Sequence, residues 1–469
     1  MPRPQSRGGR ANGGTGSALE MIAQLQGVYQ GLYATFEVLG NGAQGGAMML
    51  LRRLYHTPAV VNEFRVLSHR QIPEPWPKAV QTRWTEVHRG AASGPPSADS
   101  RTTLTLLWRS VDAALEQLIQ ERSDLNWQGV RSVLLRGLPG SGKSTSLFHC
   151  VERAREHNWL VFYLPKLYHW LHERQTCDFA LTPRSKGARG AGAVREPLFF
   201  DQARVVLDSL QACRQAHASA LESLECASTE QLQRDSDLDD EPGGSDASKG
   251  VNVSRDQHPN LLGLIDASLQ AGRRLQGDLA EVNLEHFSRN FRLFLRQLQC
   301  VREVPVLIAI DDWNLLNALT SIRHPQKRGR FLHASALRSL RPLNAWNLFT
   351  RLSARMQRGV VVCAETSARG RVDVRPTRIV GSVMHQPTAA MQRDPDGRDA
   401  LRWVTKELPT HLQPTQLRIP LFSRDEMRLL LRDLQERQVL HTIDEHSMWR
   451  LEALASGNAA RLLRICQAV

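Results

Sequence analysis

The sequence has little lysine, few aromatic residues and no regular cysteine spacing. Only seven of its 60 basic residues are lysine, and 6% of all residues are aromatic. The seven cysteines are scattered without a C-x-x-C pair, which argues against a zinc site or a disulfide framework and favours a reducing compartment. No apolar run reaches the 18 residues that a membrane span needs, so we expect no transmembrane helix.

Arginine is what the chain has in excess. The net charge is +13 and the pI is near 9.9, which favours an acidic partner: nucleic acid first, an anionic membrane surface second. Arginine suits bidentate phosphate contacts, although a GC-rich genome would give the same bias. The length of 469 residues and the hydrophobic content of 41% predict a folded protein with a large core and more than one domain.

One stretch fits the phosphate-binding pattern G-x-x-x-x-G-K-[ST] and organises the rest of the chain. Its glycines allow backbone N–H groups to surround an anion, at the positive end of the helix that follows. Residues 132–135 predict a buried strand that enters the loop, and residues 144–156 predict a helix that leaves it. We predict that the phosphate-binding residues are Gly137, Pro139, Gly140, Ser141, Gly142, Lys143, Ser144 and Thr145.

A second pattern lies about 170 residues further on. The apolar run 304–310 leads into Asp311 and Asp312, which is typical of a central parallel strand with a carboxylate at its C-terminal end. Together with the glycine-rich loop, it predicts that Ser144 and Asp311 hold Mg²⁺, Asp311 through water. Asp312 is the candidate catalytic residue that would polarise an attacking water.

The strand predicted at 359–364 is followed by polar residues. In ATPases with a strand inserted between the two nucleotide motifs, a polar residue at this place senses the γ-phosphate. Thr366 or Ser367 is the candidate, and capping of a turn is the equally good alternative.

The C-terminal end predicts three helices, over 424–438, 445–455 and 458–468. Ser423 and Glu426 form a capping box at the start of the first. A small helical domain after such a core is the lid arrangement of AAA-type and STAND-type ATPases, in which an arginine of the last element contacts the phosphates. Arg461 and Arg464 are candidates for that role, and a surface arginine is the alternative for each.

The predicted fold class is α/β: a P-loop NTPase (AAA/STAND-like) three-layer core with a C-terminal helical lid and an extended N-terminal arm. Two basic clusters, within 323–330 and 369–378, are predicted to contact a phosphate backbone. The tail has arginines and no acid, as transit peptides do, but no amphipathic pattern. The predicted domains are a flexible basic tail (1–17), the arm (18–125, helical over 104–120), the core (126–370, with a disordered insertion at 227–256), a basic connector (371–416) and the lid (417–469).

The ordered set of motifs over residues 72–469 resembles the death-associated protein three family, which comprises nucleotide-binding proteins in the head of the mitochondrial small ribosomal subunit. The motifs that carry the resemblance are Leu134-Leu135-Arg136-Gly137 leading into Gly142-Lys143-Ser144-Thr145-Ser146-Leu147, Asn158-Trp159-Leu160-Val161 ending at Pro165, Phe200-Asp201-Gln202, the strand that ends at Asp311, and the closing helix after Gly457-Asn458. The resemblance implies a mainly structural protein of the mitochondrial matrix, in contact with ribosomal RNA, with other small-subunit proteins and with the large subunit.

The resemblance also implies bound GTP or GDP with Mg²⁺. The sequence contains no N-K-x-D guanine reader, and Thr405-Lys406-Glu407-Leu408 has the wrong last residue, so ATP stays open. Asp312 departs from the pattern of animal members, in which glycine follows the aspartate of the strand. Asp312 thus supplies a carboxylate that hydrolysis would need, and the chain is expected to be at most a slow NTPase.

Two other functions compete with the ribosomal one. A signalling or remodelling NTPase that switches with nucleotide state is favoured by Asp312 and the predicted lid. A small-molecule kinase is disfavoured by the long second half of the chain and by the lack of an arginine-rich lid close to the core.

Overall fold

The structure is a computed structural model of the whole chain. It describes residues 63–68, 103–122, 131–165, 167, 171, 178–181, 197–200, 204–227, 259–273, 280–323, 331–334, 337, 340–345, 347–366, 406, 408–436, 440 and 444–468. By its contacts the chain divides into two units, Met1–Gly45 and Gly46–Val469, and every described residue belongs to the second. The predicted tail at 1–17, nearly all of the insertion predicted at 227–256 and the basic cluster within 369–378 lie outside the described residues.

A five-stranded parallel sheet forms the centre of the fold. Its strands are β3 (Ser132–Arg136), β4 (Leu160–Leu164), β7 (Val306–Ile310), β10 (Gly359–Ala364) and β11 (Thr415–Arg418). Their order is β11-β3-β10-β7-β4, and each neighbouring pair is parallel. The α/β class is therefore confirmed, and β10 is inserted between β3 and β7. The fifth strand, β11, lies across the predicted boundary between connector and lid.

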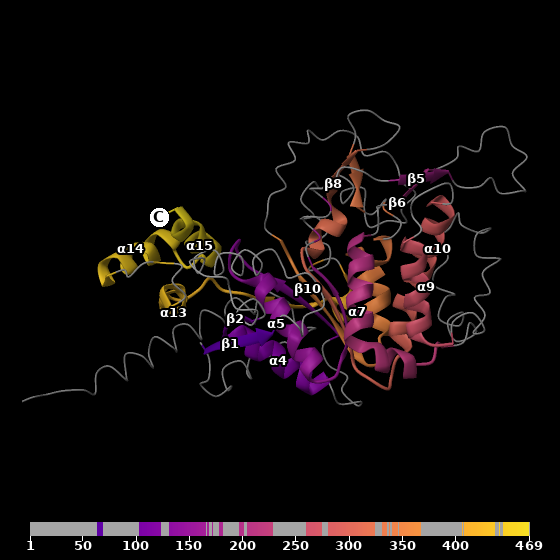
Figure 1. Cartoon of the computed structure of the whole chain (residues 1–469), viewed down its shortest axis with the longest axis horizontal. Helices are drawn as coiled ribbons and strands as arrows, with labels where there is room; N and C mark the ends of the chain where they lie inside the picture. Colours follow the sequence, from indigo (N-terminus) through magenta and orange to yellow (C-terminus); the bar gives the residue numbers. More distant parts are fainter. Residues whose placement is uncertain are drawn as a thin grey trace, which may run out of the picture. The chain divides into compact units, whose positions relative to one another are not determined.

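Helices cover both faces of this sheet (Figure 1). These helices are α4 (Ser110–Arg122), α5 (Lys143–Glu156), α7 (Arg204–Ser223), α9 (Leu261–Arg273) and α10 (Ala280–Cys300). Alternate strand residues point to opposite faces, so Leu160, Phe162 and Leu164 of β4 pack with α7, α9 and α10. Val161 and Tyr163 of the same strand pack with α4 and α5.

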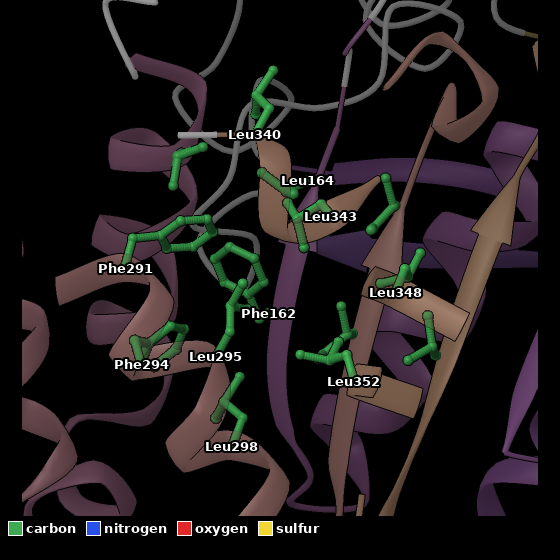
Figure 2. Close-up of a cluster of buried hydrophobic side chains, with 14 of the residues drawn as sticks. Phe162, Leu164, Phe291, Phe294, Leu295, Leu298, Leu340, Leu343, Leu348 and Leu352 are labelled. Atoms are coloured by element: carbon green, nitrogen blue, oxygen red, sulfur yellow. The ribbon is translucent and has the colours of Figure 1, made fainter. Parts of the chain in front are cut away.

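The larger core lies between the sheet and α10. Phe162 contacts two rings of α10, Phe291 at 5.8 Å and Phe294 at 5.6 Å between ring centroids. Figure 2 shows these rings beside Leu295 and Leu298, with Leu348 and Leu352 on the other side of β4 in this view. All of these side chains are buried, so this cluster fixes the β4 edge of the sheet.

Among the described residues, three antiparallel strand pairs lie outside the central sheet. They are β1 (Glu63–Ser68) with β2 (Thr103–Trp108), β5 (Asp178–Leu181) with β6 (Pro197–Phe200), and β8 (Leu319–Arg323) with β9 (Phe331–His333). The helix predicted from Leu104 is wrong for residues 104–108. This segment is a strand because threonine and leucine alternate in it, which suits a strand face, and the helix starts only at Ser110.

Several short turns complete the described chain. They are η2 (Trp313–Asn317), η4 (Arg341–Leu343), the π-helical turn η5 (Asn347–Leu352), α11 (Ser353–Arg355) and η8 (Thr410–Leu412). Of the described helices, none combines the length and the apolar character that crossing a membrane requires.

The C-terminal helices form a cluster with its own apolar core. They are α13 (Arg424–Glu436), α14 (Glu445–Ala455) and α15 (Ala459–Ala468), each close to its predicted range. Met427, Leu431, Met448 and Leu462 are buried together, and Leu107 from β2 joins them. The strand before α4 therefore packs on the C-terminal helices.

The two ends of the segment 228–258 are fastened to each other. Glu225 and Asn260 form an isolated antiparallel bridge, and Cys226 N donates to Pro259 O at 3.1 Å. Ala227 bonds through both N and O to the side chain of Gln297 on α10. Residues 225–227 and 259–260 therefore lie side by side.

Candidate functional site

The glycine-rich loop, residues 137–142, joins the carboxyl end of β3 to the first residue of α5. Gly140 has φ +75° and Gly142 has φ +94°, which are left-handed values that glycine adopts without strain. Gly142 occupies the N-cap position, so the loop turns directly into the positive end of the α5 dipole. This is the arrangement of backbone that binds anions.

Lys143 folds back over this loop. Its Nζ donates to Gly137 O at 2.8 Å and to Leu138 O at 2.9 Å. Burial lowers the pKa of the Lys143 ammonium, and nearby carboxylates act in the opposite direction. The ammonium is thus held at the mouth of the loop, where an anion would replace the two carbonyl contacts.

Asp311 lies at the carboxyl end of β7, opposite the first turn of α5. Its Oδ1 accepts from Ser144 Oγ at 2.9 Å and from Asp312 N at 3.0 Å. Burial raises the pKa of Asp311 well above its usual range, the charge of Asp312 raises it further, and the Ser144 hydrogen bond and the Lys143 charge oppose both. A divalent cation beside the Ser144 hydroxyl would compensate the buried negative charge.

Asp312 has φ +56°, a left-handed conformation that is uncommon for a residue other than glycine. Aspartate is one of the residue types that tolerate this conformation. The turn places the charges of both aspartates close enough to Lys143 to affect its pKa.

The end of β10 contributes a carboxylate that the sequence analysis did not identify. Glu365 Oε1 accepts from Gly137 N at 3.1 Å, and Glu365 Oε2 pairs with Arg136 at 3.3 Å. The side chain of Asn314 holds the backbone of Thr366. Thr366 N donates to Asn314 Oδ1 at 2.7 Å, and Asn314 Nδ2 donates to Thr366 O at 3.2 Å. Glu365 therefore reaches the loop, and Thr366 stays a predicted γ-phosphate sensor.

The remaining predicted site residues are placed as follows. Thr145 lies half-buried in the first turn of α5, and Ser141 is fully buried within the loop. Pro139 O accepts from Asn458 Nδ2 at 2.7 Å. Arg464 is exposed and its Nε donates to Ala460 O of its own helix at 3.3 Å, so its role toward a phosphate stays a prediction.

The fold therefore brings together the loop, Lys143, Ser144, Asp311 and Glu365 at the carboxyl ends of β3, β7 and β10. These groups fit a phosphate chain with Mg²⁺ in their chemistry: backbone N–H groups and one ammonium for the anion, a hydroxyl and a carboxylate for the cation. Glu365, Asn314 and the contacts of the loop with the C-terminal segment could not be found from motif spacing. Polar residues directly after a strand were the only signal for Glu365.

Comparison with solved structures gives the Aeropyrum pernix ORC2 protein in its ADP form, at 13% sequence identity and a TM-score of 0.32. The similarity covers 80% of this chain and 65% of that chain, so this chain spans less than two thirds of its length. A likeness of this size supports no argument about function. Comparison with curated protein sequences gives no match.

A family model matches residues 106–465, from β2 to the last turn of α15. Its description is mitochondrial ribosomal death-associated protein 3. The match includes the glycine-rich loop, Asp311, Glu365 and the C-terminal helices. The chain belongs to the family of mitochondrial ribosomal death-associated protein 3.

Proposed function

We propose that this mitochondrial ribosomal protein is a structural component of the small-subunit head that holds a purine nucleotide with Mg²⁺. The observation that carries the proposal is the cradle of loop 137–142, with Lys143 over its carbonyl groups and Ser144 bonded to Asp311 at 2.9 Å. The core is proposed to be a P-loop NTPase of the AAA/STAND type, with α13–α15 as its lid. Strand β10 supports this, because it is inserted between β3, which leads into the loop, and β7, which ends next to Asp311.

Each residue has a proposed role at the phosphates. The loop N–H groups orient the phosphate oxygens, and Lys143 neutralises charge on the β- and γ-phosphates. Ser144 would bind Mg²⁺ directly and Asp311 through water, and the ion would balance charge on the terminal phosphates. Glu365 holds the first N–H of the loop and so fixes where the loop begins.

The nucleotide is proposed to be GTP or GDP, on the family relationship, with ATP as the alternative. Lys406 of the T-K-E-L segment is exposed, while Leu408 is buried. This segment therefore gives no support for guanine recognition by a carboxylate. Extraction of the nucleotide from the purified protein, followed by chromatography, identifies the base.

Ribosomal RNA, other small-subunit proteins and the large subunit are the proposed partners in the mitochondrial matrix. Support comes from the net charge of +13, which suits contacts to a phosphate backbone. Of the two predicted basic clusters, only Arg323, at the end of β8, lies among the described residues. The domain boundaries predicted from the sequence are also proposals.

Sedimentation of a mitochondrial lysate through a sucrose gradient tests the ribosomal role. We expect the chain to migrate with the small subunit after a high-salt wash, as mass spectrometry of the fractions would detect. Migration as a free protein or a small oligomer would overturn the proposal. A soluble matrix enzyme followed in the same fractions controls for trapping.

A nucleotide-switched NTPase is the second candidate, and the left-handed Asp312 beside Asp311 favours it. In that case Asp312→Asn is expected to lower steady-state hydrolysis by about 100-fold or more, because general-base catalysis contributes about 10²–10⁴. Asparagine tolerates the same backbone conformation, so binding of nucleotide should persist. Phosphate release, measured with and without small subunits, checks this; no release under any condition would refute a switching role.

A further inference from the structure

The C-terminal segment packs closely against the glycine-rich loop. A Cβ atom added at Gly137 would lie 2.5 Å from Ile419 O, and one at Gly140 would lie 2.0 Å from Asn458 Oδ1. Both separations are shorter than a van der Waals contact. The loop glycines therefore provide room for this segment as well as for an anion.

Arg109 is the first of two side chains that join the loop to the C-terminal helices. It follows β2, and its side chain is only 4% exposed. Its Nη1 donates to Ser141 O at 2.7 Å, and its Nε donates to Glu426 Oε1 of α13 at 2.9 Å. The guanidinium also lies 4.1 Å from the ring centroid of Phe422. One buried side chain thus contacts the loop, the segment before α13 and α13 itself.

The carboxylate that balances Arg109 is fixed in turn. Glu426 Oε2 accepts from Ser423 N at 2.7 Å, and Ser423 Oγ accepts from Glu426 N at 3.2 Å. This is the capping box predicted from the sequence. Arg109 Nη2 adds contacts to Pro420 O at 3.1 Å and to Leu421 O at 3.3 Å. The position of Arg109 is therefore determined by the start of α13.

Asn458 is the second of these side chains. Its Nδ2 donates to Pro139 O at 2.7 Å, while its Oδ1 accepts from Arg461 N at 2.9 Å and caps α15. The single amide therefore joins the first turn of α15 to the loop. Displacement of α15 would break the contact with the loop.

Arg109 and Asn458 both donate to carbonyl groups of the loop, and these bonds orient the loop peptides. In a planar trans peptide the C=O of one residue and the N–H of the next point in opposite directions. The bond of Pro139 O to Asn458 therefore turns Gly140 N–H away from Asn458, and the bond of Ser141 O to Arg109 turns Gly142 N–H away from Arg109. These two N–H groups belong to the set that surrounds a phosphate in a glycine-rich loop.

We infer that Arg109 and Asn458 are positioning residues that couple nucleotide binding in the loop to docking of α13–α15. This inference depends on the proposed nucleotide binding. Coupling of two equilibria is reciprocal, so a nucleotide that fixes the loop N–H groups also stabilises the docked helices. The C-terminal helices then respond to nucleotide through the loop backbone, without an arginine that touches a phosphate.

Hydrogen exchange of the full chain, followed by mass spectrometry, tests the coupling. We expect GDP or GTP with Mg²⁺ to slow exchange in residues 445–468, which include α14 and α15. In Asn458→Ser this slowing should disappear and the Kd for nucleotide should rise about 3- to 10-fold, the range of one net hydrogen bond. Serine still caps α15, but it is too short to reach Pro139 O.

Two further variants separate positioning from general stability. Asp444→Ser makes the matching N-cap change on α14, where Asp444 Oδ1 accepts from Ser447 N, and it should leave the Kd unchanged. Arg109→Lys keeps a charge for Glu426 but loses the planar fork, so it should raise the Kd as Asn458→Ser does.

The outcomes distinguish this inference from the proposed function. If calorimetry shows binding but exchange at 445–468 does not respond, the coupling is refuted and nucleotide binding stands. Full nucleotide-dependent protection in Asn458→Ser would refute it as well. If the full chain binds no nucleotide, the proposed function fails and the coupling fails with it.

Discussion

Lys143→Ala is expected to weaken nucleotide binding by about 100- to 1,000-fold, as measured by isothermal titration calorimetry with GDP and GTP in Mg²⁺ buffer. Truncating one partner of a buried charged contact costs about 2–5 kcal/mol, and each 1.4 kcal/mol is tenfold in Kd. The ammonium also bonds to two loop carbonyl groups, Gly137 O and Leu138 O, so the variant loses loop order as well as charge.

Lys406→Ala is the matched control, because Lys406 is exposed and lies far along the chain from the loop. Its Kd should not change. If Lys143→Ala binds nucleotide as the wild type does, the loop is not the binding site. If the variant loses nucleotide but stays folded and enters small subunits normally, the nucleotide has no structural role. Far-UV circular dichroism of both variants shows that the comparison is made between folded proteins.

Acidification from pH 6.5 to pH 4 is expected to lower the free energy of unfolding by about 6 kcal/mol through two histidines, the buried His333 and the half-buried His217. Burial lowers the pKa of His333 to about 4; burial, together with the charge of Arg155, lowers the pKa of His217 to about 4. Above pH 6.5 both are neutral in the folded and unfolded chain. Below it, only the unfolded chain takes up protons, and each shift is worth about 3 kcal/mol at about 1.36 kcal/mol per pH unit.

The physical cause is visible at His217. Its Nε2 accepts from Val161 N at 3.2 Å on β4, which is an edge strand of the sheet, and α7 is kinked at this residue. When the ring is protonated, Nε2 carries a hydrogen and can no longer accept from Val161 N. Asp311 acts in the opposite direction, because its raised pKa adds stability as the pH falls, so it reduces the net loss.

Urea unfolding followed by tryptophan fluorescence at several pH values measures this loss. His217→Gln should remove about half of the pH dependence, since an amide oxygen can accept from Val161 N without titrating. His411→Gln, at an exposed position, should leave the dependence unchanged. A free energy of unfolding that stays constant between pH 6.5 and pH 4 would contradict the assignment.

Much of the fold could be predicted because its signals are local. The apolar runs of β7 and β10 are buried on both faces. Strand β10 has the predicted bounds, and β7 starts two residues after the predicted run and ends at the same residue. β11 was not predicted as a strand, because T-Q-L-R has one fully apolar residue, and its place in the sheet is set by pairing with β3. The start of α4 was misplaced because the leucines of β2 also fit a helical period.

The candidate site divides in the same way. Lys143, Ser144 and Asp311 could be predicted as site candidates because the spacing within a motif identifies each. The fold bonds Ser144 to Asp311 and Lys143 to the loop carbonyl of Gly137. Arg109 contacts Ser141 across 32 positions, and Asn458 contacts Pro139 across 319. No local sequence pattern distinguishes Arg109 from other buried arginines or Asn458 from other helix-capping asparagines.

The fastened ends of the segment 228–258 also make this place suitable for protein engineering. Because Glu225 pairs with Asn260 and Ala227 is held by Gln297, the two ends lie side by side and are fixed by contacts outside the segment. For a flexible insert between fixed ends, each doubling of its length costs only about 0.6 kcal/mol in loop-closure entropy. The chain could also be divided there into two co-expressed fragments that reassemble through the bridge and the packing of α7 on α9.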